Sequence, residues 1–427
     1  MIEIDKIKEL VKGHMPPYVY NDKFEAGVST VYYSGPYWDE NETVAAMNAF
    51  LNDRWVSSGE NVAKFEFLFS KKYKAESSIM VNSGSSANLV LIAGLKEHYK
   101  WEDGSEIIVS PVGFPTTISS VYQNRMTPVF VDIEWNTLNF DLTMIHKKIT
   151  PKTKAIFVSP VLGNPPDIDF LQLICKKNDI LLILDNCDSL GSKWDGKFVN
   201  EYSVAFSNSF YPAHHMTTGQ GGMVCVNDSS LSKIVESLCQ WGRGCYCRGA
   251  ANLLPNGTCG IRFSEWLDNY DGVIDHKYVF PYMGYNLKPL DLQGAIGIEQ
   301  LKKIDEIHER RVTSKKAIEK IFIENIEGLR EVVSLDKAEP SWFGTPFICE
   351  TPGLKHRLVA YLEKNKIQTR NYFAGNILLH DGYSFLDDYK KYPEANKVLD
   401  KVFFVGASPH YRQSVFDYIE EVVKKFK

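Results

Sequence analysis

The chain has 427 residues, of which 44% are hydrophobic and 24% are charged. These values are typical of folded globular proteins and exclude extended disorder. The formal net charge of -5 argues against a dedicated nucleic-acid-binding protein, which normally carries a basic surplus. The sequence has no run that approaches the ~20 apolar residues of a membrane span, and residues 1–14 lack the apolar region of a signal peptide. We therefore expect a cytoplasmic protein that binds neither nucleic acid nor membranes.

Short apolar runs alternate with helical patterns over residues 75–235. The runs are rich in Val, Ile and Phe, as is typical of strands that are buried on both faces. They occupy residues 107–111, 128–133, 154–162, 181–187, 204–210 and 221–226, and helices are expected at 86–99, 116–126 and 168–179. This alternation predicts an α/β fold with a mainly parallel sheet and helices on both sides. In such sheets, ligands bind outside the carboxyl ends of the strands.

We expect three segments along the chain. Residues 1–40 form an N-terminal arm, residues 41–305 form a large domain, and residues 306–427 form a smaller C-terminal α/β domain. The sequence pattern changes after Pro289, where residues 291–325 have the pattern of one long amphipathic helix. Because this helix can belong to either domain, the pattern places the boundary only to within tens of residues.

Polar and aromatic residues follow the apolar runs, where a ligand is expected. Ser85 and Ser86 lie beside Gly84 at the start of the helix predicted at 86–99, where they could hold a phosphate or serve only as a helix cap. Phe114 follows the 107–111 run and could cover a ligand, although taken alone its pattern favours a place in the core.

Asp185 lies near the end of the most apolar run. A carboxylate there is costly unless it meets a positive partner, such as a protonated ring nitrogen, and the alternative is a cap on the next helix. Ser209, His214 and His215 follow the next run. Two adjacent histidines cannot both face the same way, so we expect at most one of them at the centre of a site.

Taken in order, these segments resemble the DegT/DnrJ/EryC/StrS sugar aminotransferases, which have the fold-type I, aspartate aminotransferase-like PLP-dependent fold. The resemblance extends from Trp55 to the last helix and includes residues 283–301, which are similar to the family's GYN…Q-A-A segment. It implies a homodimer with shared active sites and the following cofactor contacts: Ser85, Ser86 and Ser209 at the phosphate, Phe114 on the pyridine ring, Asp185 at the ring nitrogen, and Asn286 reaching the phosphate of the neighbouring subunit.

The sequence departs from the family pattern at His214. The family has a lysine five residues after the position of Ser209, and this lysine forms a Schiff base with the cofactor aldehyde. Because an imidazole cannot form that bond, ordinary transamination is not expected. His214 can instead act as a general base, since the reference pKa of histidine, ~6.5, suits proton removal near neutrality. The expected cofactor is therefore pyridoxamine phosphate (PMP), held noncovalently.

The segment SFYPAHH at 209–215 resembles the PMP-dependent hexulose 3-dehydrases, whose typical member acts on CDP-4-keto-6-deoxy-D-glucose. These enzymes remove the C3 hydroxyl of a nucleotide-linked 4-keto-6-deoxy sugar in dideoxysugar biosynthesis. The resemblance implies that His214 removes a proton from the cofactor C4′ carbon. It also implies that Asp185 keeps the ring nitrogen protonated.

An iron–sulfur subtype of these enzymes has four cysteine ligands, the first just after the ring-nitrogen aspartate. In this chain Cys187 lies two residues after Asp185, and WGRGCYC at 241–247 is similar to the subtype. The implied ligands of a [2Fe–2S] cluster are Cys187, Cys245, Cys247 and Cys259. Such a cluster would receive its electrons from an NAD(P)H-dependent flavin and iron–sulfur reductase.

Three interpretations remain open. The first is an iron–sulfur, PMP-dependent 3-dehydrase, and the second is a cluster-free PMP-dependent 3-dehydratase that uses glutamate as amino donor. The second has no use for the four cysteines. The third is a zinc-stabilised scaffold, which the complete cofactor pocket disfavours and for which the C-x-C spacing is too tight. The sequence does not identify the nucleotide or the stereochemistry of the sugar.

Overall fold

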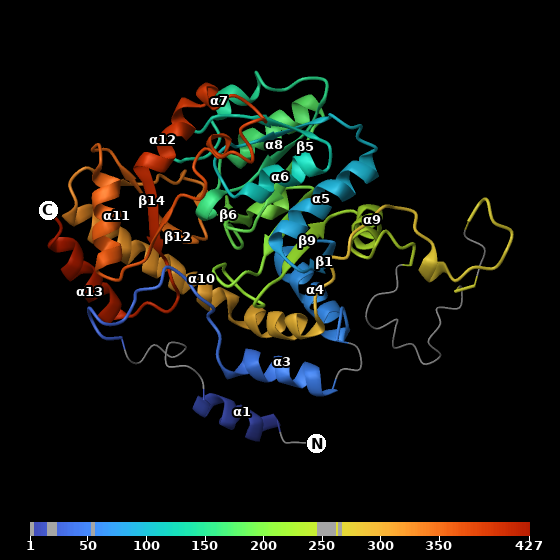
Figure 1. The fold of residues 1–427 in the computed structure, drawn as a ribbon, viewed down its shortest axis with the longest axis horizontal. Helices are drawn as coiled ribbons and strands as arrows, with labels where there is room; N and C mark the ends of the chain where they lie inside the picture. The colour runs from blue at the N-terminus through green and yellow to red at the C-terminus, as the bar shows by residue number, and fades with distance from the viewer. Residues whose placement is uncertain (1–3, 15–23, 53–55, 246–261, 264–266) are drawn as a thin grey trace.

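The computed structural model describes residues 4–14, 24–52, 56–245, 262–263 and 267–427 (Figure 1). Its N-terminal part contains the helices α1 (Ile4–His14) and α3 (Glu40–Asn52), which lie side by side at the edge of the molecule. Helix α3 packs on the long helix α10 (Asp291–Asn325), where Gln300 and Lys303 donate hydrogen bonds of 2.7 and 2.9 Å to the buried Glu42. These polar contacts attach the N-terminal segment to the main body.

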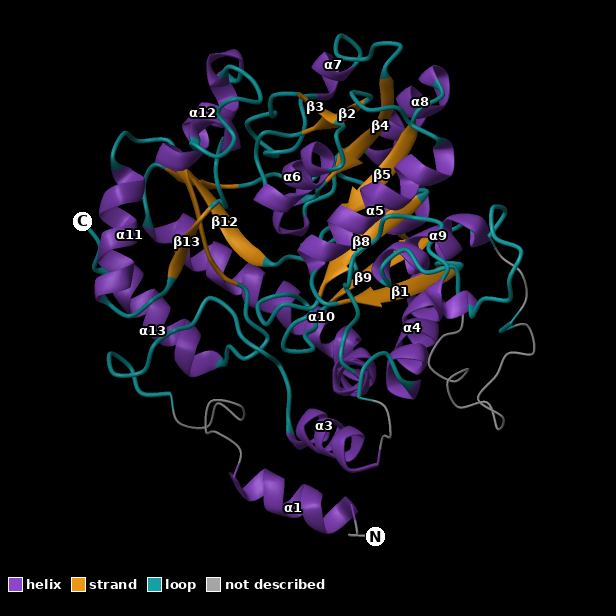
Figure 2. Ribbon diagram, turned by 45° about the vertical axis from the view of Figure 1, so that its right-hand side comes forward, coloured by secondary structure: helices purple, strands orange, loops and turns teal. Residues whose placement is uncertain are grey.

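A seven-stranded sheet forms the centre of the larger part of the molecule, with the strand order β1-β9-β8-β5-β4-β2-β3 (Figure 2). All neighbouring pairs from β8 to β3 are parallel, whereas β9 is antiparallel to both β1 and β8. The strands are β1 (Ser77–Val81), β2 (Glu106–Val109), β3 (Thr127–Phe130), β4 (Thr153–Val158), β5 (Leu181–Asp185), β8 (Ala205–Ser209) and β9 (Gly222–Val226). The predicted mainly parallel sheet is therefore confirmed.

Helices cover both faces of this sheet, and each face has its own hydrophobic core. Ile107 and Val109 of β2 point into one core, while Ile108 points into the other. This double burial explains why the strands read as continuous apolar runs. One face holds α5 (Gly84–Tyr99), α6 (Pro115–Gln123) and α9 (Ser229–Cys239), and the other holds α4 (Glu60–Tyr73), α7 (Leu142–Ile145), α8 (Ile168–Asn178) and the first half of α10.

The predicted strand at 154–162 is too long, because β4 ends at Val158. The chain leaves the sheet through Pro160 and makes a short turn at Val161–Gly163, with Leu162 at φ 54°. The turn is tight because Gly163 packs on the backbone of Ser341, where a Cβ atom would lie 2.0 Å from the Ser341 oxygen. A contact with a residue so distant in the chain leaves no pattern in the local sequence.

Helix α10 has the bounds predicted for it and extends from the large sheet to a second, antiparallel sheet with the order β10-β12-β14-β13. Phe322 of α10 stacks on Phe347 in the core of this sheet, with ring centroids 4.8 Å apart. The domain boundary predicted at residues 305/306 falls inside α10 and stays a prediction. The elements are β10 (Leu329–Glu331), β12 (Gly344–Cys349), α11 (Leu354–Lys364), β13 (Thr369–Asn371), α12 (Pro393–Lys401), β14 (Val402–Gly406) and α13 (Gln413–Lys424).

Three short strands link the two parts of the chain. Strand β11 (Ala338–Glu339) pairs with β6 (Lys193–Trp194), which pairs with β7 (Lys197–Phe198). Among the described residues, no helix is both long enough and apolar enough to cross a membrane.

Candidate active site

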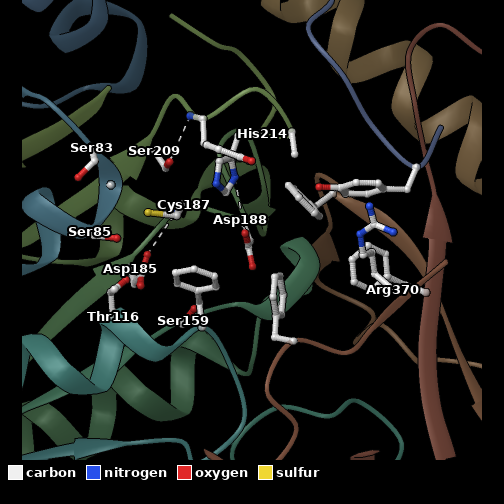
Figure 3. Close-up of a pocket in the computed structure, with 18 of the residues that line it drawn as sticks. Ser83, Ser85, Thr116, Ser159, Asp185, Cys187, Asp188, Ser209, His214 and Arg370 are labelled. Atoms are coloured by element: carbon white, nitrogen blue, oxygen red, sulfur yellow. Dashed lines mark hydrogen bonds and ion pairs between the residues drawn. The ribbon is translucent and has the colours of Figure 1, made fainter. Parts of the chain in front are cut away.

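The carboxyl ends of the parallel strands open into a cavity of about 700 Å³ (Figure 3). Its walls come from the segments that follow β2, β4, β5 and β8, and from the first turn of α5. The second sheet closes the other side through Arg370 on β13 and Phe404 on β14. Six of the residues predicted for the site line this one cavity, namely Ser85, Phe114, Asp185, Cys187, Ser209 and His214.

One end of the cavity is built to hold an anion at the amino terminus of α5. Ser83 caps the helix by accepting a hydrogen bond of 3.0 Å from the Ser86 amide, and the Ser85 side chain lines the cavity. Gly84 permits the approach of Ser209, since a Cβ atom on Gly84 would lie 2.4 Å from the Ser209 Cβ atom. Helix-start amides together with two serine hydroxyls fit a phosphate group at this position.

Asp185 lies at the end of β5 and is only 3% exposed. Its Oδ2 atom accepts hydrogen bonds of 2.7 Å from Asn88 and 2.6 Å from Thr117, and its Oδ1 atom accepts one of 3.2 Å from the Cys187 amide. Among the described residues, no cation forms an ion pair with this carboxylate. A buried carboxylate at the floor of a cavity fits a protonated ring nitrogen as its missing partner.

Phe114 forms part of the cavity wall and is 49% exposed, so the core position that its pattern alone favoured is wrong. Its ring meets Phe373 edge-on, with centroids 6.1 Å apart. The exposed ring supplies an aromatic surface for a planar ligand.

His214 lies in the cavity, whereas the next residue, His215, points away from it and shares a hydrogen bond of 2.9 Å with the Ser341 carbonyl oxygen. The Nδ1 atom of His214 is buried without a hydrogen-bond partner and lies 3.6 Å from the Asp188 Oδ1 atom. Burial, followed by the charge of Arg311, lowers the pKa of His214 to about 3. The imidazole is therefore neutral at neutral pH.

The sequence interpretation missed Arg311, which is 1% exposed on α10. Its guanidinium donates hydrogen bonds of 3.1 and 2.9 Å to the carbonyl oxygens of Ala213 and His214, and one of 3.1 Å to that of Phe343. These bonds hold the His214 turn against the start of β12. The long charged face of the helix pattern offered no sign that this one cation points inward.

The remaining predicted residues lie elsewhere. The Ser86 hydroxyl accepts a hydrogen bond from Ser83, and Ser86 is not part of the cavity lining. Asn286 is exposed and does not line the cavity of its own chain. Cys245 is buried outside the lining, and Cys247 and Cys259 lie outside the described residues.

The fold and the cavity define a fold-type I, PLP-dependent α/β protein, and pyridoxal or pyridoxamine phosphate fits the residues present. The anion cradle, the unpaired carboxylate of Asp185 and the unpartnered Nδ1 of His214 each supply one required contact. The chain belongs to the DegT/DnrJ/EryC1/StrS aminotransferase family, which it matches over residues 38–427.

Two curated relatives are similar to most of the chain. The dTDP-4-dehydro-2,6-dideoxy-D-glucose 3-dehydratase of Saccharopolyspora spinosa is 35% identical and covers 94% of this chain and 88% of its own length. The lipopolysaccharide biosynthesis protein RfbH of Salmonella typhimurium is 34% identical and covers 99% of this chain and 97% of its own length.

A solved structure has the same fold over nearly its whole length. It is GDP-4-keto-6-deoxymannose-3-dehydratase with a trapped PLP–glutamate geminal diamine, and it superimposes with a TM-score of 0.79 at 29% identity. The match covers 93% of this chain and 100% of that one. The family and fold expected from the sequence are thus confirmed, and nucleotide-sugar 3-dehydratases are among the relatives.

Proposed function

We propose that this protein removes the C3 hydroxyl from a nucleotide-linked 4-keto-6-deoxy sugar, with PMP as its cofactor. The observation that carries the proposal is His214, which lies in the cofactor cavity where a lysine is expected of an aminotransferase. A cavity without that lysine does not hold the cofactor covalently, so the chain is suited to a reaction other than ordinary transamination. The relatives that act as 3-dehydratases support this reaction class.

Each residue of the cavity has a distinct task in this reaction. The first turn of α5, with Ser85 and Ser209, holds the phosphate. Asp185 would hold a proton on the ring nitrogen of the cofactor, and neutral His214 would take a proton from its C4′ carbon. When bound, PMP supplies an amine that reacts with the sugar ketone and a conjugated ring that accepts electrons as the C3 hydroxide leaves.

Direct assay tests the proposal. Purified protein, PMP and glutamate are incubated separately with the CDP-, GDP- and dTDP-linked 4-keto-6-deoxyhexoses, and the products are analysed by mass spectrometry. We expect a product that lacks the C3 oxygen from at least one of them. Amination at C4 with the C3 oxygen retained would contradict the proposal and assign the chain to ordinary sugar transamination.

Glutamate is the first candidate for the source of the reducing electrons. In this route glutamate would supply both the amino group that restores PMP and the two reducing electrons, and it would be oxidised to 2-oxoglutarate. The C3 hydroxide would leave as water, and the amino group would be released as ammonium when the 4-keto product is freed. The solved relative with a trapped PLP–glutamate species supports this cluster-free route. If this route operates, we expect 2-oxoglutarate to form at the same rate as the deoxygenated sugar.

A [2Fe–2S] cluster fed by a reductase is the second candidate, and Cys187 is the observation that favours it. Its thiol lines the cavity two residues after Asp185. Among the described residues, no group of three or more His, Cys, Asp or Glu is placed to hold a metal ion. Two of the four proposed ligands, Cys247 and Cys259, fall outside those residues. The cluster and its reductase therefore rest on the sequence resemblance together with Cys187.

The Cys187→Ser variant separates the two routes. Cysteine thiolate is the iron ligand, so this change is expected to remove the iron from anaerobically purified protein if the second route operates. The matched control is Cys175→Ser on α8, which is buried outside the cavity lining and should retain the iron. Wild-type protein without iron or sulfide, together with undiminished glutamate-dependent turnover in Cys187→Ser, would contradict the cluster.

The activity should depend on pH through Asp188, the carboxyl group next to His214. Burial, followed by the charge of Asp185, raises the pKa of Asp188 to about 8. Below that pH the group is neutral, and above it the carboxylate stabilises a protonated His214, by about one to three pKa units for an opposite charge this close. Turnover should therefore rise with pH through about 8. In Asp188→Asn this rise should be absent, and a rise that persists would contradict the role of Asp188.

The dimer is part of the proposal. Asn286 is exposed next to a stretch with unusually exposed apolar side chains, of which Met283 is 98% and Tyr278 65% exposed. A second copy that covers this stretch would bring Asn286 to the neighbouring cavity. Light scattering of the purified protein should give twice the chain mass of 48.6 kDa.

The cytoplasmic location and the choice of CDP as nucleotide stay predictions.

A further inference from the structure

Arg370 brings a positive charge into the cavity from the second sheet. It lies on β13, the edge strand of that sheet, and is one of the lining residues. The other titratable groups of the lining are Asp185, Asp188, His214, Cys187 and the two tyrosines. Because His214 is neutral, Arg370 is the one permanent cation among the described residues of the wall.

The guanidinium of Arg370 is held in place yet unpaired. Its carbon atom lies 4.1 Å from the centroid of the Tyr33 ring, and its NH1 group donates a hydrogen bond of 2.7 Å to the Thr369 carbonyl oxygen. Within the part of the chain that the structure describes, no carboxylate forms an ion pair with it. The aromatic contact fixes the plane of the guanidinium, and the remaining N–H groups are available to a ligand.

The location of Arg370 separates it from the phosphate end. Figure 3 shows Ser83 and Ser85 on one side of the cavity and Arg370 on the other, with His214 and Asp188 between them. The cofactor phosphate has its own cradle at α5, so it does not need this cation. A second anion is therefore expected at the end formed by β13.

We propose that Arg370 binds an oxyanion of the second reactant, on the side of the cavity opposite the cofactor phosphate. The inference rests on the proposed function, which supplies two sources of this chemistry: a phosphoryl group of the nucleotide sugar and a carboxylate of the amino donor. Arginine suits both, since its planar fork forms paired hydrogen bonds with either group.

Binding measurements on the full-length protein loaded with PMP test the inference and identify the source. CDP, GDP, dTDP and L-glutamate are titrated separately by calorimetry into the wild type, Arg370→Lys and Arg370→Gln. We expect Arg370→Gln to weaken one class of probe by about 10–100-fold, the range for a hydrogen-bonded charged group, while the other class is unaffected. A loss confined to the diphosphates assigns the phosphoryl group, and a loss confined to glutamate assigns the carboxylate. The affinity of Arg370→Lys for the affected probe should lie between the affinities of the wild type and Arg370→Gln.

A second arginine of the same sheet provides the control. Arg330 on β10 forms an ion pair of 2.5 Å with Glu350 and does not line the cavity, so Arg330→Gln should bind every probe as the wild type does. Unchanged affinity for all probes in Arg370→Gln overturns the inference, as does a wild type that binds none of them. Loss of PMP from Arg370→Gln also overturns it, because Arg370 would then belong to the cofactor site. Since no turnover is measured, weakened binding supports the inference even if 3-dehydration fails.

Discussion

Replacement of His214 by asparagine is expected to lower turnover by about 10²–10⁴-fold, the usual contribution of a positioned general base. The imidazole is neutral and unpartnered at Nδ1, and it lines the same cavity as Asp185. Asparagine is polar and of similar size, but it does not accept a proton near neutral pH. Affinity for PMP should remain within a few-fold of the wild type, since the phosphate cradle and Asp185 are untouched.

The neighbouring histidine gives a matched control for this prediction. His215 has the same chemistry but is more deeply buried, and its ring contacts Ser341 outside the cavity. His215→Asn should therefore reduce stability rather than turnover per folded molecule. Steady-state rates and PMP titrations of both variants check the prediction. Normal turnover in His214→Asn with retained PMP would show that another group removes the proton.

Most of the fold follows from local patterns in the sequence. The central strands are apolar on both faces, so each appears in the sequence as a continuous apolar run. Such runs indicate a parallel sheet even when the contacts between distant segments are not known. Helix α10 was predicted with its observed bounds because its pattern is long and regular. The error at 159–162 has a different origin, because Gly163 turns against the backbone of Ser341. That contact depends on a segment far along the chain.

The same distinction separates the site residues that the sequence revealed from those that it did not. Asp185 and Ser209 end the strands β5 and β8, and Ser85 and His214 follow β1 and β8 within a few residues. Because ligands bind at the carboxyl ends of the strands in such sheets, the sequence places these residues together. Arg370 lines the cavity from a strand of the second sheet, and Arg311 on α10 donates hydrogen bonds to the backbone of the His214 turn. In the sequence alone, neither arginine can be distinguished from a cation on the protein surface, because its contacts form only when the second sheet packs against the first. Their roles depend on tertiary structure and could not be inferred from spacing.

Replacement of Asp185 by asparagine is the second change from which we expect a large effect. The carboxylate is buried at the carboxyl end of β5, and its two oxygens accept hydrogen bonds from Asn88, Thr117 and the Cys187 amide. The carbonyl oxygen of an asparagine can replace Oδ2 and keep the bonds from Asn88 and Thr117. Its amide nitrogen, in place of Oδ1, is a donor and cannot hold a proton on a ring nitrogen.

We therefore expect Asp185→Asn to keep its fold and its PMP while turnover falls by about 10²–10³-fold, the range for removing one preorganised electrostatic group. The absorption spectrum of the bound cofactor, recorded from pH 6 to pH 9, should change with pH in the variant and stay constant in the wild type. Thr117→Val is the matched control, because it removes one hydrogen bond to the same carboxylate but leaves its charge. Turnover of Asp185→Asn close to that of Thr117→Val would contradict the assignment, because the carboxylate would then act only as a hydrogen-bond acceptor that orders the floor of the cavity.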